Sequence, residues 1–349
     1  MNLKDRPDVS PGQLHDTVEN ALNGLKVFNL LNISIELDIF DFLNKQMTYK
    51  QISEKLGIEP VLTYYLLEAL VKLGLIEKLG EFYKNTRASQ LYLNSESDYN
   101  QSNCMLFLKG KADSWNNLEH ALKGDLYQKD ENSYPFLIQA VAEDCLSGEL
   151  QETIELVANY NEFKRSKTLL DVGGGHGLYS IAFNQANPDL QCYVFDFPEV
   201  LKETQKFIEK YNSSVSTIPG NFYTDDFVGS YDIIFSSYNP GGKNPEIAKK
   251  VYNSLNLNGL FLNKQYFPED EKDTLEANLD SLEWNFTNFE KTSNSKERFS
   301  FKGDLSFEDY ITFLENLRFN IIDIHYIDHF NSPFGPKAVN KLIVAKKVR

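Results

Sequence analysis

The sequence predicts an α/β fold in which a mostly parallel sheet with a terminal antiparallel strand follows an α-helical domain. From residue 166 onward, apolar runs of strand length alternate with helical patterns, as in a parallel sheet with helices on both faces. Before residue 166, apolar side chains recur mainly at helical spacing. We therefore expect four segments: a mobile tail at 1–14, a helical domain at 15–100, a helical linker at 101–165 and the sheet domain at 166–349.

Composition and charge are those of an ordinary soluble protein. The 349 residues are 42% hydrophobic and 24% charged, and no apolar run reaches the ~20 residues that span a membrane. The N-terminus lacks a signal-peptide pattern and three widely spaced cysteines suit a reducing compartment, so we expect a cytoplasmic protein without a metal site. A net charge of −15 argues against nucleic acid and anionic membranes, and favours a small neutral or cationic ligand.

The first helical segment carries more apolar surface than one small domain would normally bury. Between His15 and Asn44, apolar residues follow two helical stripes, one ending near Leu31 and the other running from Ile33 to Leu43. Unburied apolar surface of this size is typical of a subunit interface. We therefore expect a homodimer formed through this segment.

Residues 48–88 are predicted to form a winged helix. Thr48 caps a short helix that stops at Gly57, a second helix starts at Pro60, and a hairpin follows. DNA-reading helices present basic and amide side chains, whereas 60–73 holds a single cation. Because the whole segment has six Lys or Arg against five acids, a structural or dimerising role is favoured over DNA binding.

The linker at 101–165 is expected to cover a ligand site, because the glycine-rich start of the sheet domain follows it directly. Its large side chains belong to the core by default, but some must lie over the site. With aromatic residues of the sheet domain they make a set suited to a flat or apolar molecule. The candidate lining residues are Trp115, Phe136, Val141, Tyr238, Tyr266 and Trp284.

Seven strands are predicted in the sheet domain. The parallel ones are expected at Thr168–Val172, Gln191–Phe195, Val215–Ile218, Tyr231–Phe235 and Leu260–Lys264. The last two flank a turn at 331–336 and are expected at Asn320–Ile327 and Lys337–Lys346, with helices at Asn244–Leu255 and from Ser306 to Leu314. Ligands of such sheets bind beyond the carboxyl ends of the strands.

A glycine-rich stretch, Leu169 to Ser180, organises this domain. Its apolar strand breaks into Gly173-Gly174-Gly175, and Gly177 follows before a helical pattern resumes. Glycines let the backbone turn tightly and approach a ligand that a Cβ would exclude. Asp196 ends the next apolar run, nineteen residues after Gly177, where an acid can accept hydrogen bonds from ribose hydroxyls. The stretch therefore predicts a nucleoside-binding loop.

Three features favour S-adenosylmethionine (SAM) over a dinucleotide as the ligand. Asp171 precedes the glycines, where a dinucleotide fingerprint requires no acid and where a carboxylate could meet the ligand's ammonium through water. A helical domain precedes the loop. The chain also ends in a strand pair, which fits the terminal reversed strand of methyltransferase sheets.

Residues from about 15 to 347 resemble the two-domain O-methyltransferases related to caffeate and acetylserotonin methyltransferases. The matching signatures are Leu170–Gly177, Phe195–Val200, Gly220–Phe222, Tyr231–Phe235, the Asn258-Gly259 turn and Phe267–Asp270. The resemblance implies a winged-helix dimerisation domain followed by a Rossmann-like, SAM-binding domain.

The same resemblance implies the cofactor-binding residues. Gly173 and Gly175 would lie against the methionine and ribose parts of SAM, Asp196 would take the ribose hydroxyls, and Phe197 would pack on the adenine. Asn221 stands where the family usually has an aspartate beside the adenine amino group, and the phenylalanine after it would flank the same ring. The full candidate set is Asp171, Gly173, Gly175, Asp196, Phe197, Asn221 and Phe222.

One departure from the family concerns the catalytic base. Most members carry a histidine after strand four that deprotonates the substrate hydroxyl. Here residues 236–243 contain no histidine, and Lys264 stands at the end of strand five where the family tends to place a glutamate. We therefore expect methyl transfer that works by positioning, onto oxygen or onto sulfur or nitrogen, with Tyr238, Asn239 and Tyr266 as candidate catalytic residues.

Several alternatives stay open. Another group could supply the base, for example His176 in the glycine loop, or His325 and His329 beside the last turn. Asn239-Pro240 is partly similar to the Asn-Pro-Pro-aromatic motif of amino methyltransferases. Finally, some proteins of this fold keep SAM but catalyse decarboxylation, hydroxylation or rearrangement instead of methyl transfer.

Overall fold

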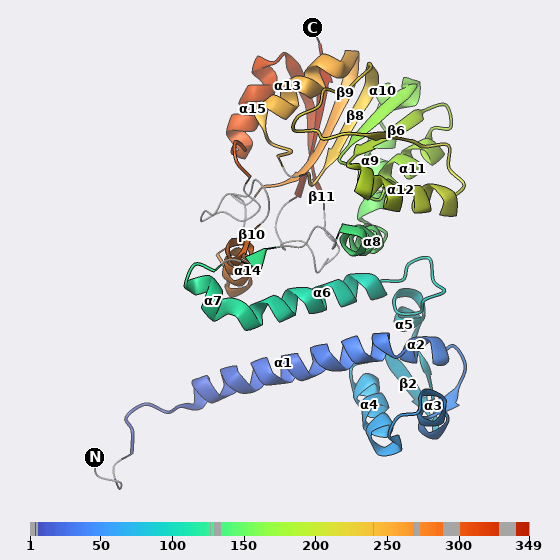
Figure 1. The fold of residues 1–349 in the computed structure, drawn as a ribbon, viewed down its shortest axis with the longest axis vertical. Coiled ribbons are helices and arrows are strands. Elements are labelled where there is room, and N and C mark those ends of the chain that lie inside the picture. Colours follow the sequence, from blue (N-terminus) through green and yellow to red (C-terminus); the bar gives the residue numbers. More distant parts are fainter. Residues whose placement is uncertain are drawn as a thin grey trace. The chain divides into compact units, whose positions relative to one another are not determined.

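The structure is a computed structural model that describes residues 4, 6–125, 127–128, 134–239, 241–267, 273–288, 301–327 and 340–348. Its chain forms two compact units, residues 1–109 and 110–349 (Figure 1). The roles predicted for the segments 15–100 and 101–165 stay predictions.

The N-terminal unit begins with one long helix. Helix α1 (Gly12–Glu36) starts inside the predicted tail, and the second helix, α2 (Ile39–Phe42), is short, so the break between the two predicted helices lies later than the sequence suggests. Asp38, between them, has a left-handed φ of 53°, which breaks the helix. The first part of α1 keeps its apolar side chains exposed, namely Leu14, Val18, Leu22 and Leu25.

The predicted pair of short helices and the hairpin are confirmed. The elements are β1 (Met47–Thr48), α3 (Tyr49–Leu56), α4 (Pro60–Lys72), β2 (Ile76–Leu79) and β3 (Phe82–Asn85). Thr48 and Gln51 form a capping box, since the Thr48 Oγ1 accepts from the Gln51 N–H and the Gln51 Oε1 accepts from the Thr48 N–H. Gly57, with a φ of 66°, ends α3.

Short helices connect this part to the sheet. They are α5 (Arg87–Tyr92), α6 (Ser102–Ser114), the 3-10 turn η1 (Trp115–Asn117), α7 (Leu118–Leu122), α8 (Tyr134–Cys145), α9 (Glu149–Ala158) and α10 (Asn161–Arg165). A two-residue strand, β4 (Tyr127–Gln128), pairs with β10 (Thr287–Asn288). The described part of 101–165 is therefore mainly helical, as the periodicity predicts.

The second unit contains the predicted sheet. Its strands are β5 (Thr168–Val172), β6 (Gln191–Asp196), β7 (Ser216–Pro219), β8 (Tyr231–Ser237), β9 (Leu255–Tyr266), β11 (Phe319–Ile327) and β12 (Asn340–Lys347). They lie in the order β11-β12-β9-β8-β5-β6-β7, and β12 runs antiparallel to both of its neighbours. The mostly parallel sheet with a terminal reversed strand is confirmed, whereas the predicted turn at 331–336 and the first residues of the last predicted strand lie outside the described residues.

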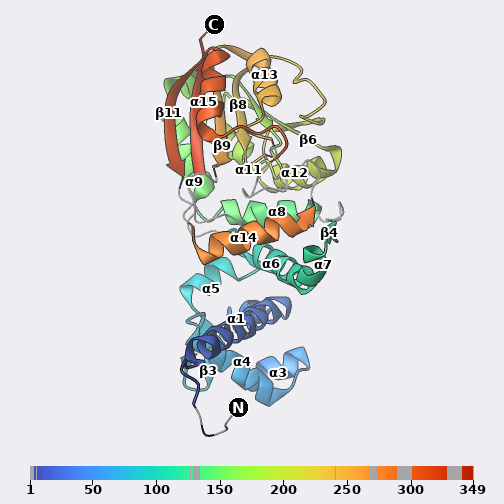
Figure 2. The ribbon, with the colours of Figure 1, turned by 90° about the vertical axis from the view of Figure 1, so that its left-hand side faces the viewer.

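Helices cover both faces of this sheet (Figure 1). One face packs against α9, α11 (Leu178–Ala186) and α12 (Pro198–Lys210), and the other against α13 (Pro245–Ser254) and α15 (Phe307–Asn316). Two separate apolar clusters form the core on the two faces. Both views place α8 and α14 (Leu275–Phe286) beyond the edge at which the parallel strands end (Figures 1 and 2).

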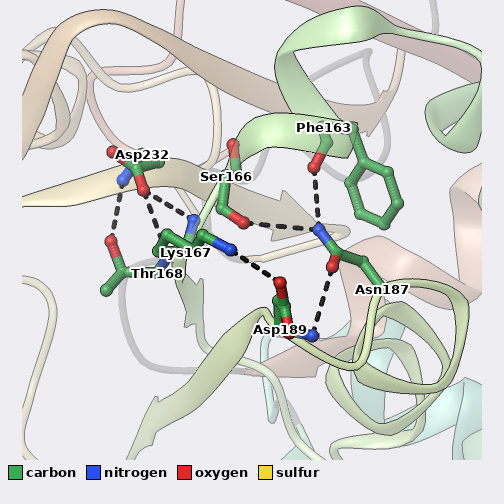
Figure 3. Close-up of polar contacts among 7 residues, drawn as sticks. All are labelled: Phe163, Ser166, Lys167, Thr168, Asn187, Asp189 and Asp232. Atoms are coloured by element: carbon green, nitrogen blue, oxygen red, sulfur yellow. Dashed lines mark hydrogen bonds and ion pairs between the residues drawn. The ribbon is translucent and has the colours of Figure 1, made fainter.

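Hydrogen bonds at the opposite edge fix where β5 and β8 begin (Figure 3). The Asp232 carboxylate accepts from the backbone N–H groups of Lys167 and Thr168 at 2.8 and 3.2 Å. Asn187, in the loop before β6, donates to two carbonyl oxygens at the end of α10, those of Phe163 and Ser166. These bonds therefore anchor the amino end of β5, the strand that leads to the glycine-rich stretch.

Candidate functional site

The glycine-rich loop lies where the order of the strands reverses. Strand β5 pairs with β6 on one side and with β8 on the other, so the chain crosses the sheet in opposite directions from this point. Sheets of this kind bind ligands in the crevice beyond such a switch point. The loop at 173–177 follows β5 directly, as the sequence predicts.

The loop requires glycine at several positions. Gly173, Gly175 and Gly177 have φ values of 63°, 53° and 73°, a conformation that other residues adopt at a cost. A Cβ on Gly173 would lie 2.5 Å from the Asn239 Oδ1 atom, and one on Gly177 would lie 2.8 Å from the Thr204 side chain. Thr204 also donates a hydrogen bond of 2.5 Å to the Gly175 carbonyl. The neighbouring side chains thus leave no room for a Cβ at these two positions, which keeps the backbone of the loop bare.

Asp196 holds the loop from the end of β6. One of its carboxylate oxygens accepts from the Gly175 N–H at 2.9 Å, and the other accepts from the Phe197 N–H at 2.7 Å. Each oxygen keeps a further lone pair, so the carboxylate can also accept from hydroxyl groups. Burial raises the pKa of Asp196 to about 6, so it is mainly ionised at neutral pH.

Asp171 lies beneath the loop. It is buried, accepts a hydrogen bond of 2.8 Å from the Ser180 hydroxyl, and would touch any Cβ added to Gly174. Burial raises its pKa to about 7, and the neighbouring charge of Asp196 adds to this shift. The sequence predicts that the Asp171 carboxylate meets the SAM ammonium through water, and this stays a prediction. The structure adds that Asp171 packs against Gly174.

The three residues expected near an adenine ring lie in different surroundings. Phe197 is half-buried at the start of α12. The Asn221 amide oxygen accepts from the Tyr223 N–H at 2.9 Å, so it also holds its own turn. Phe222 is buried in the cluster between the sheet and α13, where it packs as a core residue.

The loop after β8 lies against the glycines. The Asn239 amide nitrogen donates to the Val172 carbonyl and, at 3.0 Å, to the Ser236 hydroxyl, which fixes its side chain on Gly173. Tyr238, just before it, has a φ of 51° and is partly exposed. Tyr266, the third candidate catalytic residue, is buried at the end of β9.

Sequence reasoning missed one group of side chains at this edge. Lys264 is fully buried, and its ammonium lies 2.5 Å both from a carboxylate oxygen of Glu149 and from the Tyr179 hydroxyl. A lysine at the end of an apolar strand was a visible signal, because a buried charge requires a partner. The identity of that partner, 115 residues away in the chain, was not visible.

The expected lining residues come from separate elements. Phe136 and Val141 belong to α8, whose Ile138 side chain lies 3.4 Å from the place of a Cβ on Gly175. Trp115 donates a 2.9 Å hydrogen bond to Glu283 of α14. Trp284 packs edge-on against Phe301. Helix α8 therefore covers the glycine loop, while both tryptophans take part in contacts of α14.

The histidines have local partners. The His176 Nδ1 atom accepts from the Leu178 N–H at 3.0 Å, and burial lowers its pKa to about 4, so it is neutral at pH 7. His325 is hydrogen-bonded to the Tyr160 hydroxyl at 2.6 Å. His329 lies outside the described residues.

A metal site and a membrane span were both expected to be absent. Among the described residues, no group of three His, Cys, Asp or Glu side chains could hold a metal ion. Within the same residues, every helix is too short or too polar to cross a bilayer.

Known proteins resemble this chain along most of its length. It matches the O-methyltransferase dimerisation domain over residues 19–95 and the O-methyltransferase domain over residues 128–283. An uncharacterized protein from Methanocaldococcus jannaschii is 42% identical over 93% of this chain and 89% of its own length. The L-tyrosine C(3)-methyltransferase of Streptomyces lavendulae is 25% identical over 75% of this chain and 77% of its own.

A solved structure shows the same fold. Human N-acetylserotonin methyltransferase, in complex with SAM, superposes with a TM-score of 0.71 at 19% identity, with 100% of both chains covered. Together with the two matched domains and the glycine loop, this similarity identifies the cofactor as SAM. The chain is an enzyme that belongs to the family of SAM-dependent O-methyltransferases.

Proposed function

We propose that this enzyme methylates a small aromatic or apolar molecule, and that it does so by positioning the acceptor rather than with a histidine base. The observation that carries the proposal is the glycine loop, a bare backbone fixed between Asn239, Thr204 and Asp196. A ligand held there meets the loop after β8 on one side and α8 on the other. These two elements would form the acceptor site.

The residues of the loop fit the nucleoside of SAM. Gly173 has no room for a Cβ beside Asn239, so the loop backbone stays bare, and the lone pairs of Asp196 suit ribose hydroxyls. Phe197 and Asn221 would border the adenine, whereas Phe222, which is buried in the core, would support the adenine site from below. Bound SAM supplies an electrophilic methyl group on a positively charged sulfur. The chain's own residues would orient it and exclude water.

The acceptor atom is proposed to be oxygen, with sulfur and nitrogen as further options. Segment 236–243 has no histidine, so an acceptor that is already nucleophilic would gain most from in-line positioning. The name of the Streptomyces lavendulae relative shows that carbon is an acceptor for one similar enzyme. Tyr238 and Tyr266 would border the acceptor, and Asn239 would act by holding the loop.

A second function is a SAM-supported reaction other than methyl transfer, such as decarboxylation, hydroxylation or rearrangement. The observation that favours it is the replacement of the family's acidic residue by the buried Lys264. A buried lysine–glutamate pair in this place suits an acceptor site that differs from those of phenol methyltransferases.

The N-terminal unit is proposed to form a homodimer through a winged-helix domain. Its match to an O-methyltransferase dimerisation domain and the exposed apolar face of α1 support this assembly. Analytical ultracentrifugation at micromolar concentration should show a dimer, and a stable monomer would contradict the proposal.

Two experiments test the proposed reaction. Calorimetry should show that SAM binds and that the Asp196→Ala substitution weakens binding. Methyl-labelled SAM incubated with a small-molecule extract of the source cells should then give a labelled product. Consumption of SAM without transferred label would favour the second function. If millimolar SAM gives no binding signal and no thermal shift, both proposed functions are contradicted.

A further inference from the structure

Four polar side chains from four elements meet behind the loop that follows β8. The Lys264 ammonium, at the end of β9, pairs with the Glu149 carboxylate at the start of α9 and with the Tyr179 hydroxyl of α11. The rings of Tyr179 and Tyr238 lie over the same nitrogen, with centroids 4.2 and 4.8 Å away. We refer to Glu149, Tyr179, Tyr238 and Lys264 as the acceptor-edge cluster.

Fold stability does not explain this ion pair. Taking two charges out of water costs several kcal/mol for each ion, and apolar residues of similar volume are often as stabilising or more so. Lys264 continues the row of Leu260 and Leu262 on the face that packs against α9 and α11, and its neighbour on β12 is Leu342. An apolar residue would fit that row, so the charges point to a role in the site.

Tyr238 joins the pair to the open side of the site. Its hydroxyl is hydrogen-bonded to Glu149, and its backbone N–H donates to the Lys264 carbonyl at 2.9 Å. A φ of 51° costs a non-glycine residue of order 1 kcal/mol, and such strain is typical of functional sites. The residue is 36% exposed, and Asn239 after it touches Gly173. The segment Tyr238-Asn239 therefore connects the buried pair with the SAM loop, the first residue through Glu149 and the second through Gly173.

We propose that Tyr238 is the catalytic residue that removes the proton of the acceptor hydroxyl, and that Glu149 and Lys264 position it. The proposal rests on the proposed methyl transfer. As the acceptor oxygen forms its bond to the methyl carbon, the bond from that carbon to sulfur breaks and its electron pair stays on sulfur. The acceptor proton passes to the Tyr238 oxygen, and the phenolic proton of Tyr238 passes to the Glu149 carboxylate.

This proton path keeps the net charge of the site constant. The positive charge of the sulfonium and the negative charge of Glu149 disappear in the same step, while the Lys264 ammonium is unchanged. The step therefore separates no charges, and the positive charge that SAM brings into the site remains afterwards on Lys264, whose carboxylate partner is then neutral. Lys264 stabilises the ionised form of Glu149 before the step and holds its carboxylate toward the phenol.

The groups that face this path come from every element around it. The titratable and charged groups are Asp144 and Cys145 of α8, Glu149 and Glu152 of α9, His176, Tyr179 and Lys264. Burial, with the charge of Glu149 and the hydrogen bond to it, holds the pKa of Tyr238 well above its usual range. The phenol is thus neutral before the step and can both donate to Glu149 and accept from the acceptor.

The first test needs neither SAM nor an acceptor. In the free protein, carbon-13 NMR of labelled tyrosine follows the ionisation of Tyr238, which the Tyr238→Phe variant assigns. Glu149→Gln removes the negative charge with little change of shape, so Tyr238 should ionise at a lower pH than in the wild type. Glu155→Gln, the same change at an exposed site on α9, should leave the titration unchanged. An unaltered titration in Glu149→Gln overturns the proposal.

The second test follows label transfer from methyl-labelled SAM to the small-molecule extract. Near neutral pH, Glu149→Gln and Tyr238→Phe should each lower the rate by about 100-fold or more, as removal of an acid–base group does. The variants should gain rate with rising pH, about tenfold per pH unit, because the acceptor must then ionise by itself. SAM affinity measured by calorimetry should stay within about twofold of the wild type.

The outcomes separate the two proposals. A wild-type enzyme that transfers no label contradicts the proposed function and, with it, the proton path. A wild-type enzyme that transfers label while Glu149→Gln is equally fast, with the same pH profile, overturns only the proton path. Rescue of part of the rate by Glu149→Asp would support it, because that variant keeps a carboxylate.

Discussion

The SAM loop and the acceptor-edge cluster share one edge of the sheet but are built in different ways. The loop is made of backbone, and the residues that shape it lie mostly between Asp171 and Thr204. The cluster is made of side chains that are far apart in the sequence, since Glu149 and Lys264 are 115 positions apart. A backbone site is impaired when an atom is added, whereas a side-chain site is impaired when a group is removed.

The largest effect is expected from breaking the buried pair. Lys264→Met leaves Glu149 buried without its ammonium partner, which should lower the free energy of unfolding by about 3–5 kcal/mol. Urea unfolding of the free protein measures this loss. The double variant Glu149→Gln/Lys264→Met should recover most of it, and a double variant as unstable as the single one would contradict the account.

A second effect concerns the pH dependence of stability. Burial raises the pKa of Asp171 to about 7, so the folded state binds this proton more tightly than the unfolded chain does. The resulting stabilisation is present at low pH and is lost as the pH rises from about 4 through about 7. The Asp171→Asn side chain stays neutral and can keep the hydrogen bond to Ser180. The free energy of unfolding of this variant at pH 8 should therefore exceed that of the wild type by up to about 4 kcal/mol.

Thermal unfolding of both proteins at pH 5 and pH 8 checks this sign. Asp189→Asn is the matched control, because the Lys167 ammonium lowers the pKa of Asp189 and its contribution is lost on acidification instead. A difference between Asp171→Asn and the wild type that does not change with pH would show that Asp171 is not buried as a carboxyl group.

The smallest effect tests the backbone site by adding one carbon. Gly173→Ala places a Cβ against Asn239 at a φ of 63°, so SAM affinity should fall by about 10- to 100-fold, which corresponds to about 1–3 kcal/mol of strain. Gly110→Ala, with no heavy atom within 4 Å of its added Cβ, should leave the affinity unchanged. Calorimetry measures both, and an unchanged affinity in Gly173→Ala would contradict the proposed contact.

The difference between a site built from local backbone and a site built from distant side chains also explains what could be predicted from the sequence. The strands, their parallel arrangement, the glycine loop and Asp196 follow from local patterns, because periodicity, caps and glycines act over a few residues. The break between the two predicted helices lies at Asp38 rather than near Leu31, and no local pattern marks Asp38 as a helix end.

The acceptor edge could be predicted only in part. Tyr238 and Lys264 were visible as residues at strand ends, but their connection through Glu149 depends on how α9 packs against the sheet. The catalytic role predicted for Asn239 stays a prediction, and the structure adds that its amide holds the glycine loop through the Val172 carbonyl. The burial of Phe222 against α13 was likewise not visible in the sequence, and its predicted place beside the adenine stays a prediction.

The central claim is that the SAM loop binds the cofactor independently of the acceptor-edge cluster. Calorimetric titration of SAM into the wild type, Asp196→Ala and Glu149→Gln tests this claim most directly. We predict that SAM binds the wild type, that Asp196→Ala loses about 1.5–3 kcal/mol of binding free energy, and that Glu149→Gln binds like the wild type. Equal affinity in all three proteins, or no binding to the wild type, would contradict the account.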